Sequence, residues 1–200
     1  MNLPNKITVL RIVLTITIIV VLLGGNYTVS IFGFEIPKLF VNEAIVVDLK
    51  YIIAGVLFVI ASITDFFDGY LARKYNLITD FGKLVDAIAD KILVNSVLII
   101  LASQGFIHPI IPVVIIMRDS VVNSIKMLAA SKGKVVAAIK LGKVKTACMM
   151  TGISLTLFYN LPFELYNISV SKALLFIATI LSVISGRQYY SMNRYLVNDK

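Results

Sequence analysis

Cysteine, histidine and tryptophan are nearly or wholly absent from this chain, and their scarcity excludes several kinds of site. The 200 residues contain one cysteine, one histidine and no tryptophan. The single cysteine, Cys148, excludes an internal disulfide, and the single histidine, His108, excludes a zinc site built from several histidines. Charged residues make up 15% of the chain and hydrophobic residues 58%. Soluble domains are roughly 45–50% apolar, so this composition argues against a soluble protein.

Long apolar runs recur along the whole chain, whose mean hydropathy is +0.91. This pattern is typical of a polytopic helical membrane protein. We therefore expect an all-α fold, a six-transmembrane-helix bundle, in a single domain over residues 1–200. Breaks such as Gly24-Gly25-Asn26 and Asn160-Leu161-Pro162 separate the runs, and no cleavage site follows the first of them, so it is expected to be retained. The expected helices cover residues 7–24, 50–73, 82–103, 108–130, 143–160 and 170–190.

The basic residues indicate the topology of these helices. The net charge is +8, and with both termini placed in the cytoplasm, nearly all Lys and Arg residues fall in cytoplasmic loops and helix ends. The opposite side keeps Lys38, Lys50 and Lys172, which is a strong positive-inside bias. Basic residues placed in this way favour contact with anionic membrane lipids over nucleic acid. Residues 25–48 become an outer loop with little chemical signal.

Four aspartates stand out in this apolar chain. Asp65 and Asp68 are three residues apart, and Asp86 and Asp90 are four apart, so each pair shares one face of a helix. A carboxylate at the centre of a membrane helix costs roughly 2.5–3.5 kcal/mol, and four of them require a compensating charge. The two helices are joined by a short connection, so antiparallel packing can turn both acidic faces into one cleft.

Oxygen ligands of this kind suit Mg²⁺ or Mn²⁺ better than zinc. Two such ions can hold the attacking and leaving oxygens of a phosphoryl transfer. Gly69 and Gly82 remove side chains where a ligand approaches, and Arg73 offers a planar cation for phosphate. The alternative is that the aspartates form buried salt bridges or line an ion path, and the spacing together with the glycines and the arginine favours a metal site.

The run from Asp65 to Asp90 resembles the signature of the CDP-alcohol phosphotransferases. Its pattern D-x2-D-G-x2-A-R-x8-G-x3-D-x3-D is met at every position by Asp65, Asp68, Gly69, Ala72, Arg73, Gly82, Asp86 and Asp90. The resemblance implies two divalent cations, Mg²⁺ or Mn²⁺, held by the four aspartates, with Asp90 as the catalytic base that deprotonates the acceptor hydroxyl. It also implies a CDP-binding pocket formed by Asp65, Asp68, Gly69, Ala72, Arg73 and Gly82.

The choice of acceptor depends on other segments. Pro4, Asn5, Thr8 and Arg11 precede or begin the first helix in a way that resembles the bacterial phosphatidylglycerophosphate synthases, although a helix start with cations reaching the interface explains them equally well. Arg118 interrupts an apolar helix, and the stretch Gly142-Lys143-Val144-Lys145-Thr146 resembles the same group. A helix N-terminus favours anions, so we expect an acceptor phosphate site formed by Arg118, Lys143, Lys145 and Arg187.

These features favour transfer from CDP-diacylglycerol to sn-glycerol 3-phosphate, giving phosphatidylglycerol phosphate and CMP. Inositol phosphate, or phosphatidylglycerol as in a cardiolipin synthase, remains open as another acceptor. A divalent-cation transporter is the alternative of another class, but it would place acids in both halves of the chain. The resemblance further implies a homodimer in the bacterial plasma membrane, with the active site facing the cytoplasm.

Overall fold

A computed structural model describes residues 3–32, 38–41, 45–74, 80–134, 136 and 139–197 of the chain. Within these ranges the side chains of 3–7, 25–32, 38–41, 45–46, 66–74, 80–81, 83–84, 87 and 196–197 are outside the description. The described residues form six α-helices and one short hairpin: α1(Leu3–Phe32), β1(Lys38–Val41), β2(Ile45–Asp48), α2(Leu49–Lys74), α3(Asp80–Ser103), α4(Ile110–Ser131), α5(Lys140–Leu157) and α6(Val170–Val197). The predicted six-helix bundle is thus confirmed as a helical fold.

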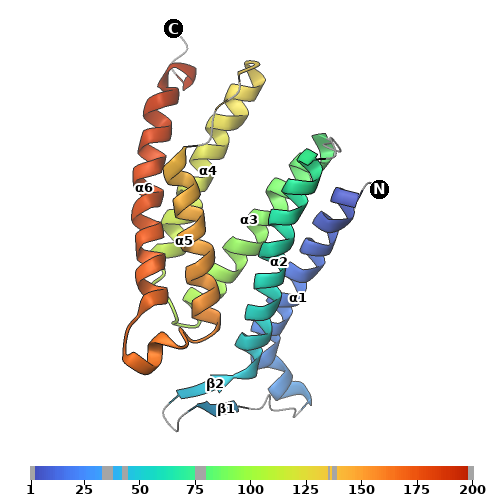
Figure 1. The fold of residues 1–200 in the computed structure, drawn as a ribbon, viewed down its shortest axis with the longest axis vertical. Helices are drawn as coiled ribbons and strands as arrows, with labels where there is room; N and C mark the ends of the chain where they lie inside the picture. The colour runs from blue at the N-terminus through green and yellow to red at the C-terminus, as the bar shows by residue number, and fades with distance from the viewer. Residues whose placement is uncertain are drawn as a thin grey trace.

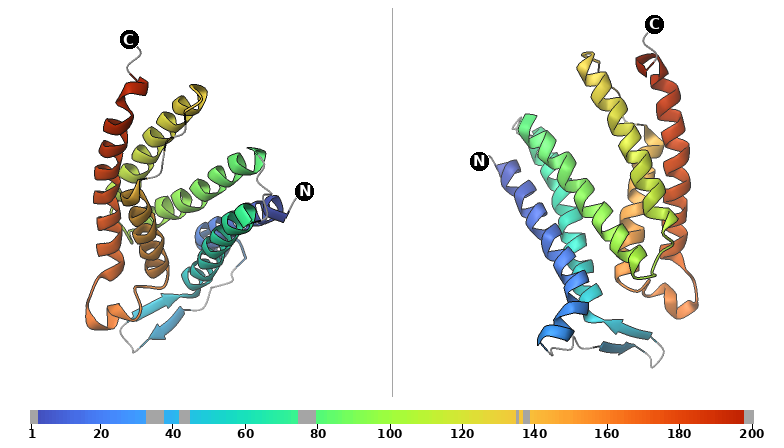
Figure 2. Two further views of the ribbon diagram at one scale, coloured as in Figure 1. Left: turned by 45° about the horizontal axis from the view of Figure 1, so that its top comes forward. Right: turned by 180° about the vertical axis from the view of Figure 1, so that it is seen from behind.

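The helices form two groups of three, which both figures show side by side (Figures 1 and 2). In one group α1 packs against α2 and α3, and in the other α6 packs against α4 and α5. Contacts of α2 with α5 and of α3 with α4 join the groups. Both chain ends point toward the same end of the bundle, and the hairpin lies at the other end (Figure 1).

Close approaches between helices depend on two glycines. A Cβ atom at Gly55 of α2 would lie 3.1 Å from the ring of Phe158, just after α5. A Cβ atom at Gly152 of α5 would lie 2.9 Å from Leu175 Cγ on α6. Both helix pairs therefore pack at distances that a larger side chain would increase.

Three aromatic rings join the connections at the hairpin end. Tyr51 at the start of α2 lies 4.8 Å from Phe106, which follows α3, measured between ring centroids. Tyr159, which follows α5, lies 5.6 Å from Tyr51 and 5.7 Å from Phe106. Its hydroxyl accepts a hydrogen bond from the backbone N–H of Asp48 at 3.0 Å. The cluster fixes this end of the bundle, and thereby how the two groups meet.

Several helix ends differ from the expected ones: α1 begins at Leu3, α5 covers Lys140–Leu157, and α6 continues to Val197. The first helix continues through Gly24, Gly25 and Asn26 to Phe32, because glycine inside a helix costs only about 1 kcal/mol. The expected outer loop contains an antiparallel hairpin in which Lys38 pairs with Asp48 and Val41 with Ile45. Strands of four residues carry too little periodicity to be distinguished in sequence.

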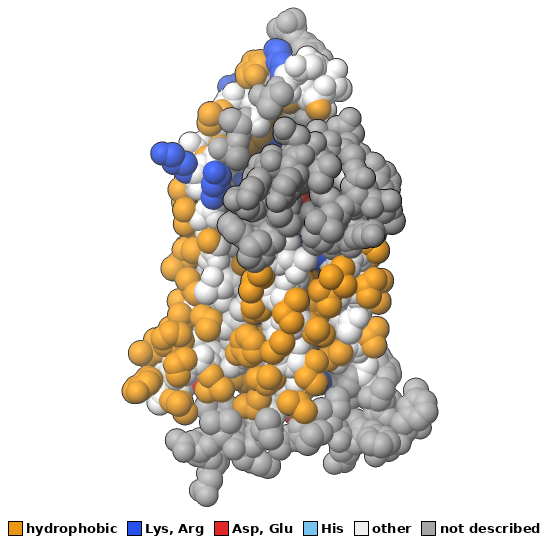
Figure 3. Space-filling view, turned by 45° about the vertical axis from the view of Figure 1, so that its right-hand side comes forward, with side chains coloured by type: hydrophobic (Ala, Val, Ile, Leu, Met, Phe, Trp, Pro, Cys, Tyr) orange, Lys and Arg blue, Asp and Glu red, His pale blue; other side chains and the backbone are white. Residues whose placement is uncertain are grey.

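On the face that Figure 3 shows, apolar side chains cover much of the middle of the bundle, and Lys and Arg side chains gather toward the end that carries the C-terminus. Among the described residues, Val170–Tyr195 is the helix long and apolar enough to cross a membrane by length and composition, with a hydropathy of 1.5. Thr8–Gly24 is a shorter apolar stretch. The six-span topology and the orientation of the termini stay predictions.

Candidate active site

Arg11 on α1 joins the two helices that carry the aspartate motif. Its Nη1 lies 2.6 Å from Oδ1 of Asp65 on α2 and 2.6 Å from Oδ1 of Asp86 on α3. The arginine side chain is fully buried, whereas those of Asp65 and Asp86 are 36% and 43% exposed. One guanidinium group therefore brings acids from two helices together.

Arg11 reaches this position because of the face of α1 on which it lies. Thr8, Arg11, Thr15, Ile18 and Leu22 recur every three or four residues, and all five are buried. The stripe is apolar toward the middle of the helix and polar toward its start. The sequence shows this spacing, but the partner of Arg11 could not be predicted because it lies 75 positions away.

Asp90 lies one turn beyond Asp86 on α3, with its side chain partly buried. Arg11, Asp86, Asp119 and Lys145 lie near enough for their charges to act on it. Asp90 is therefore within electrostatic range of two groups of charged side chains.

The remaining motif residues are placed by their backbone. Asp68, Gly69, Ala72 and Arg73 belong to α2, but their side chains lie outside the described residues. Gly82 lies in the first turn of α3. The expected nucleotide pocket around these residues therefore stays a prediction.

A second group of charges connects α4 with α5. Lys145 Nζ on α5 lies 2.9 Å from both carboxylate oxygens of Asp119 on α4. Arg118 donates from Nη1 to Asp119 Oδ1 at 2.8 Å. The Lys145 side chain is 3% exposed and that of Asp119 22% exposed. Two cations thus share one carboxylate, so this group retains a formal charge of one positive unit.

Arg118 also contacts α6, where Gly186 makes room for it. Its Nη2 donates to Ser185 Oγ at 2.9 Å. A Cβ atom at Gly186 would lie 2.9 Å from Arg118 Cγ, and one at Gly142 would lie 3.7 Å from Arg118 Nη2. Side-chain hydrogen bonds and close packing therefore fix the guanidinium between three helices. The contributions of Asp119, Ser185 and Gly186 were missed by the sequence, since each depends on a contact between helices.

The other two residues expected in the acceptor site lie at the surface. Lys143 on α5 and Arg187 on α6 are both exposed. The structure brings Lys145 and Arg118 together through Asp119, but the described contacts do not include Lys143 or Arg187 in that group. Their expected role in binding phosphate stays a prediction.

The pair formed by Asp65 and Asp86 fits a divalent cation by its chemistry. Both offer hard carboxylate oxygens, which Mg²⁺ and Mn²⁺ prefer, and both remain partly exposed beside the buried Arg11. Among the described side chains, no three of His, Cys, Asp or Glu lie together as a cation site. A third protein ligand would have to come from Asp68, whose side chain is outside the description, or from Asp90.

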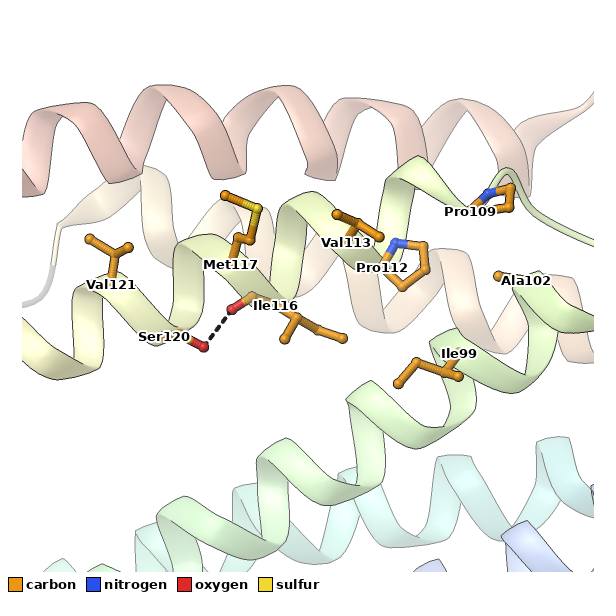
Figure 4. A pocket seen from close by; sticks show the side chains of 9 residues that line it. All are labelled: Ile99, Ala102, Pro109, Pro112, Val113, Ile116, Met117, Ser120 and Val121. Atoms are coloured by element: carbon orange, nitrogen blue, oxygen red, sulfur yellow. Dashed lines mark hydrogen bonds between the residues drawn. The ribbon is translucent and has the colours of Figure 1, made fainter.

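An apolar groove of about 700 Å³ lies between α3 and α4 (Figure 4). Ile99 and Ala102 line it from α3, and Pro112, Ile116 and Met117 from α4. Ser120 is polar, but its hydroxyl donates to the carbonyl of Ile116 at 2.8 Å. The groove therefore has the character of a surface that faces hydrocarbon.

Known proteins resemble this chain over nearly its whole length. The family model described as CDP-alcohol phosphatidyltransferase matches residues 1–184. A protein of Bacillus subtilis named CDP-diacylglycerol--glycerol-3-phosphate 3-phosphatidyltransferase is 39% identical over 96% of this chain and 95% of its own length. Proteins of the same name from Mycoplasma pneumoniae and Rickettsia bellii are 37% and 34% identical, over 78% and 94% of this chain and 68% and 93% of their own lengths.

Proposed function

Because the chain belongs to the CDP-alcohol phosphatidyltransferase family, we propose that it transfers the phosphatidyl group of CDP-diacylglycerol to sn-glycerol 3-phosphate. The products are phosphatidylglycerol phosphate and CMP. The names of two relatives that match this chain almost end to end supply these substrates. The observation that carries the choice of acceptor is the pair of cations, Arg118 and Lys145, that Asp119 holds together on α4 and α5.

The proposed reaction exchanges one phosphorus–oxygen bond for another. The acceptor hydroxyl oxygen forms a bond to the β-phosphorus of CDP-diacylglycerol, while the bond from that phosphorus to the bridging oxygen breaks and its electron pair leaves with CMP. The carboxylate of Asp90 takes the hydroxyl proton, which requires hydrogen-bond distance in the substrate complex. Two divalent cations, Mg²⁺ or Mn²⁺, held by Asp65, Asp68, Asp86 and Asp90, would neutralise the developing phosphate charge.

The charged group on α4 and α5 supports an acceptor that itself carries phosphate. Arg118 is a planar donor for phosphate oxygens, and Lys145 adds a second, nearly buried cation. An acceptor that carries phosphate gains binding energy from both cations, whereas serine carries no phosphate for them to bind. Lys143 and Arg187, exposed on α5 and α6, are proposed to draw the acceptor toward this site.

The membrane arrangement is part of the proposal. Residues 1–200 form a single domain whose six helices cross the bacterial plasma membrane, with both termini and the active site on the cytoplasmic side. The basic residues near the end that carries the C-terminus support this orientation, and they suit contact with anionic lipids. We expect a homodimer on the basis of the family resemblance.

An assay of the purified protein with a panel of acceptors tests the proposal. CDP-diacylglycerol is combined with glycerol 3-phosphate, inositol phosphate, phosphatidylglycerol or serine, and CMP is measured. We expect CMP release with glycerol 3-phosphate far above that with the others. Faster release with another acceptor would assign the chain to another reaction of the family, and no CMP with any of them would favour cation transport.

A further inference from the structure

The contact of Arg11 with two aspartates places a positive charge inside the proposed metal site. Its Nη1 lies 2.6 Å from Oδ1 of both Asp65 and Asp86, which are on different helices. Hydrogen bonds of this length between charged groups are strong and directional. The two carboxylates carry like charges that repel each other, and one guanidinium group holds them together.

Burial distinguishes the two sides of this contact. The side chain of Arg11 is 0% exposed, and those of Asp65 and Asp86 are 36% and 43% exposed. Arg11 thus approaches the carboxylates from the interior of the bundle, and the acids keep part of their surface open on the other side. A cation could bind from the open side while Arg11 stays in place.

This burial also argues against an ordinary role in binding lipid headgroups. A cation that reaches the membrane interface keeps its charged group in water, whereas the side chain of Arg11 is fully buried. A buried arginine requires paired charges, and Asp65 and Asp86 meet that requirement.

We infer that Arg11 is an internal counter-cation of the carboxylate site, a positioning residue with two effects. It holds Asp65 and Asp86 together when no divalent cation is bound, and by its like charge it weakens the binding of that cation. The inference rests on the proposed metal site. Arg11 and the metal ion would then both stabilise the packing of α1, α2 and α3. When one of them is removed, the stability of this packing depends more on the other.

Purified Arg11→Gln, Arg11→Lys and Thr15→Val proteins test this coupling. Thr15 lies one turn away on the same buried face, and its hydroxyl donates to the Arg11 carbonyl at 2.8 Å, so Thr15→Val perturbs α1 packing without a change of charge. The melting temperature Tm is measured after chelation and again in excess Mg²⁺. Mn²⁺ affinity is measured directly by electron paramagnetic resonance.

We expect Arg11→Gln to lower Tm without metal, to gain more Tm from Mg²⁺ than the unaltered protein, and to bind Mn²⁺ roughly tenfold more tightly, since a like charge has been removed. Arg11→Lys should keep a Kd near that of the unaltered protein because it keeps the charge. Thr15→Val should change Tm equally with and without Mg²⁺.

Two outcomes would contradict this inference and leave the proposed metal site intact. One is an Arg11→Gln protein whose gain in Tm and whose Mn²⁺ affinity equal those of the unaltered protein. The other is an Arg11→Gln protein that fails to fold even when Mg²⁺ is present throughout purification. An unaltered protein that binds no Mn²⁺ would contradict the proposed metal site itself, and the inference with it.

Discussion

Lys145 on α5 bonds to both carboxylate oxygens of Asp119 on α4, each at 2.9 Å. Asp119 also accepts from Arg118, its neighbour in the chain. An incoming phosphate would meet two cations already held in place, because the carboxylate has fixed their side chains beforehand. Binding to such a site loses less conformational entropy than binding to two free side chains.

Replacing Lys145 with alanine should weaken binding of the acceptor more than binding of the lipid donor. A charge-assisted hydrogen bond contributes about 1.5–3 kcal/mol, so KM for glycerol 3-phosphate should rise about 10- to 100-fold. KM for CDP-diacylglycerol should change little. Steady-state kinetics that follow CMP, with each substrate varied in turn, check this.

Lys140→Ala is the matched control for Lys145→Ala. Lys140 is also a lysine of α5, but it is exposed, so its removal should leave both KM values nearly unchanged. Equal rises in both KM values for Lys145→Ala would place the lysine outside the acceptor site.

Gly186→Ala should disturb the same site by displacing Arg118. The added methyl group would lie 2.9 Å from Arg118 Cγ, so the arginine must move. At Gly142 the nearest atom of Arg118 would be 3.7 Å away, which is ordinary contact. We expect KM for glycerol 3-phosphate to rise roughly tenfold with Gly186→Ala, because at least one hydrogen bond of the guanidinium is lost.

Gly142→Ala serves as the comparison for that substitution. Gly142 on α5 faces the same arginine as Gly186 on α6. Gly142→Ala should raise KM for glycerol 3-phosphate much less than Gly186→Ala does. If both glycine variants behave alike, the position of Arg118 does not govern binding of the acceptor.

Asp90→Asn should abolish CMP release while the protein stays folded. The amide cannot accept the hydroxyl proton as a carboxylate does, and loss of a general base typically costs 10²- to 10⁴-fold in rate, here in kcat. The Tm in detergent should remain close to that of the unaltered protein. Near-normal turnover by this variant would remove Asp90 from the role of base.

Removal of divalent cations should stop the reaction reversibly. Chelation should lower CMP release to background, and either Mg²⁺ or Mn²⁺ should restore it, because both take carboxylate oxygens. The readout is the rate before chelation, after chelation and after addition of each metal. Full activity in excess chelator would argue against the proposed metal site.

Gly152→Ala tests the packing of α5 on α6. The added methyl group would lie 2.9 Å from Leu175 Cγ and 3.3 Å from the Leu175 backbone nitrogen, and overpacking of this kind costs typically about 1–3 kcal/mol. The Tm in detergent should fall clearly. At Gly24 the nearest atom would be 3.9 Å away, so Gly24→Ala should leave Tm unchanged or raise it.

The sequence predicted the helices better than their ends. Apolar runs indicate where helices lie, and all six were found among the described residues. The end of α1 was wrong because Gly24 and Gly25 suggest a break, whereas the helix continues to Phe32. Glycine inside a helix costs only about 1 kcal/mol, so two glycines need not end it.

The site was predictable where it depends on spacing and hidden where it depends on packing. Helical periodicity predicts that Asp86 and Asp90 share a face. No periodicity links Arg11 to Asp86, which lie 75 positions apart and meet because α1 packs against α3. The contact of Asp119 with Lys145 could not be predicted for the same reason, since it depends on how α4 and α5 pack. Sequence patterns therefore identified charges, and the structure identified their partners.

Incorporation of labelled glycerol 3-phosphate into lipid tests the central claim most directly. Purified protein is supplied with CDP-diacylglycerol, Mg²⁺ and radiolabelled sn-glycerol 3-phosphate, and labelled lipid and CMP are measured in the same samples. The proposed reaction predicts equal amounts of CMP and of labelled phosphatidylglycerol phosphate at every time point. CMP without labelled lipid, or no CMP at all, would contradict it.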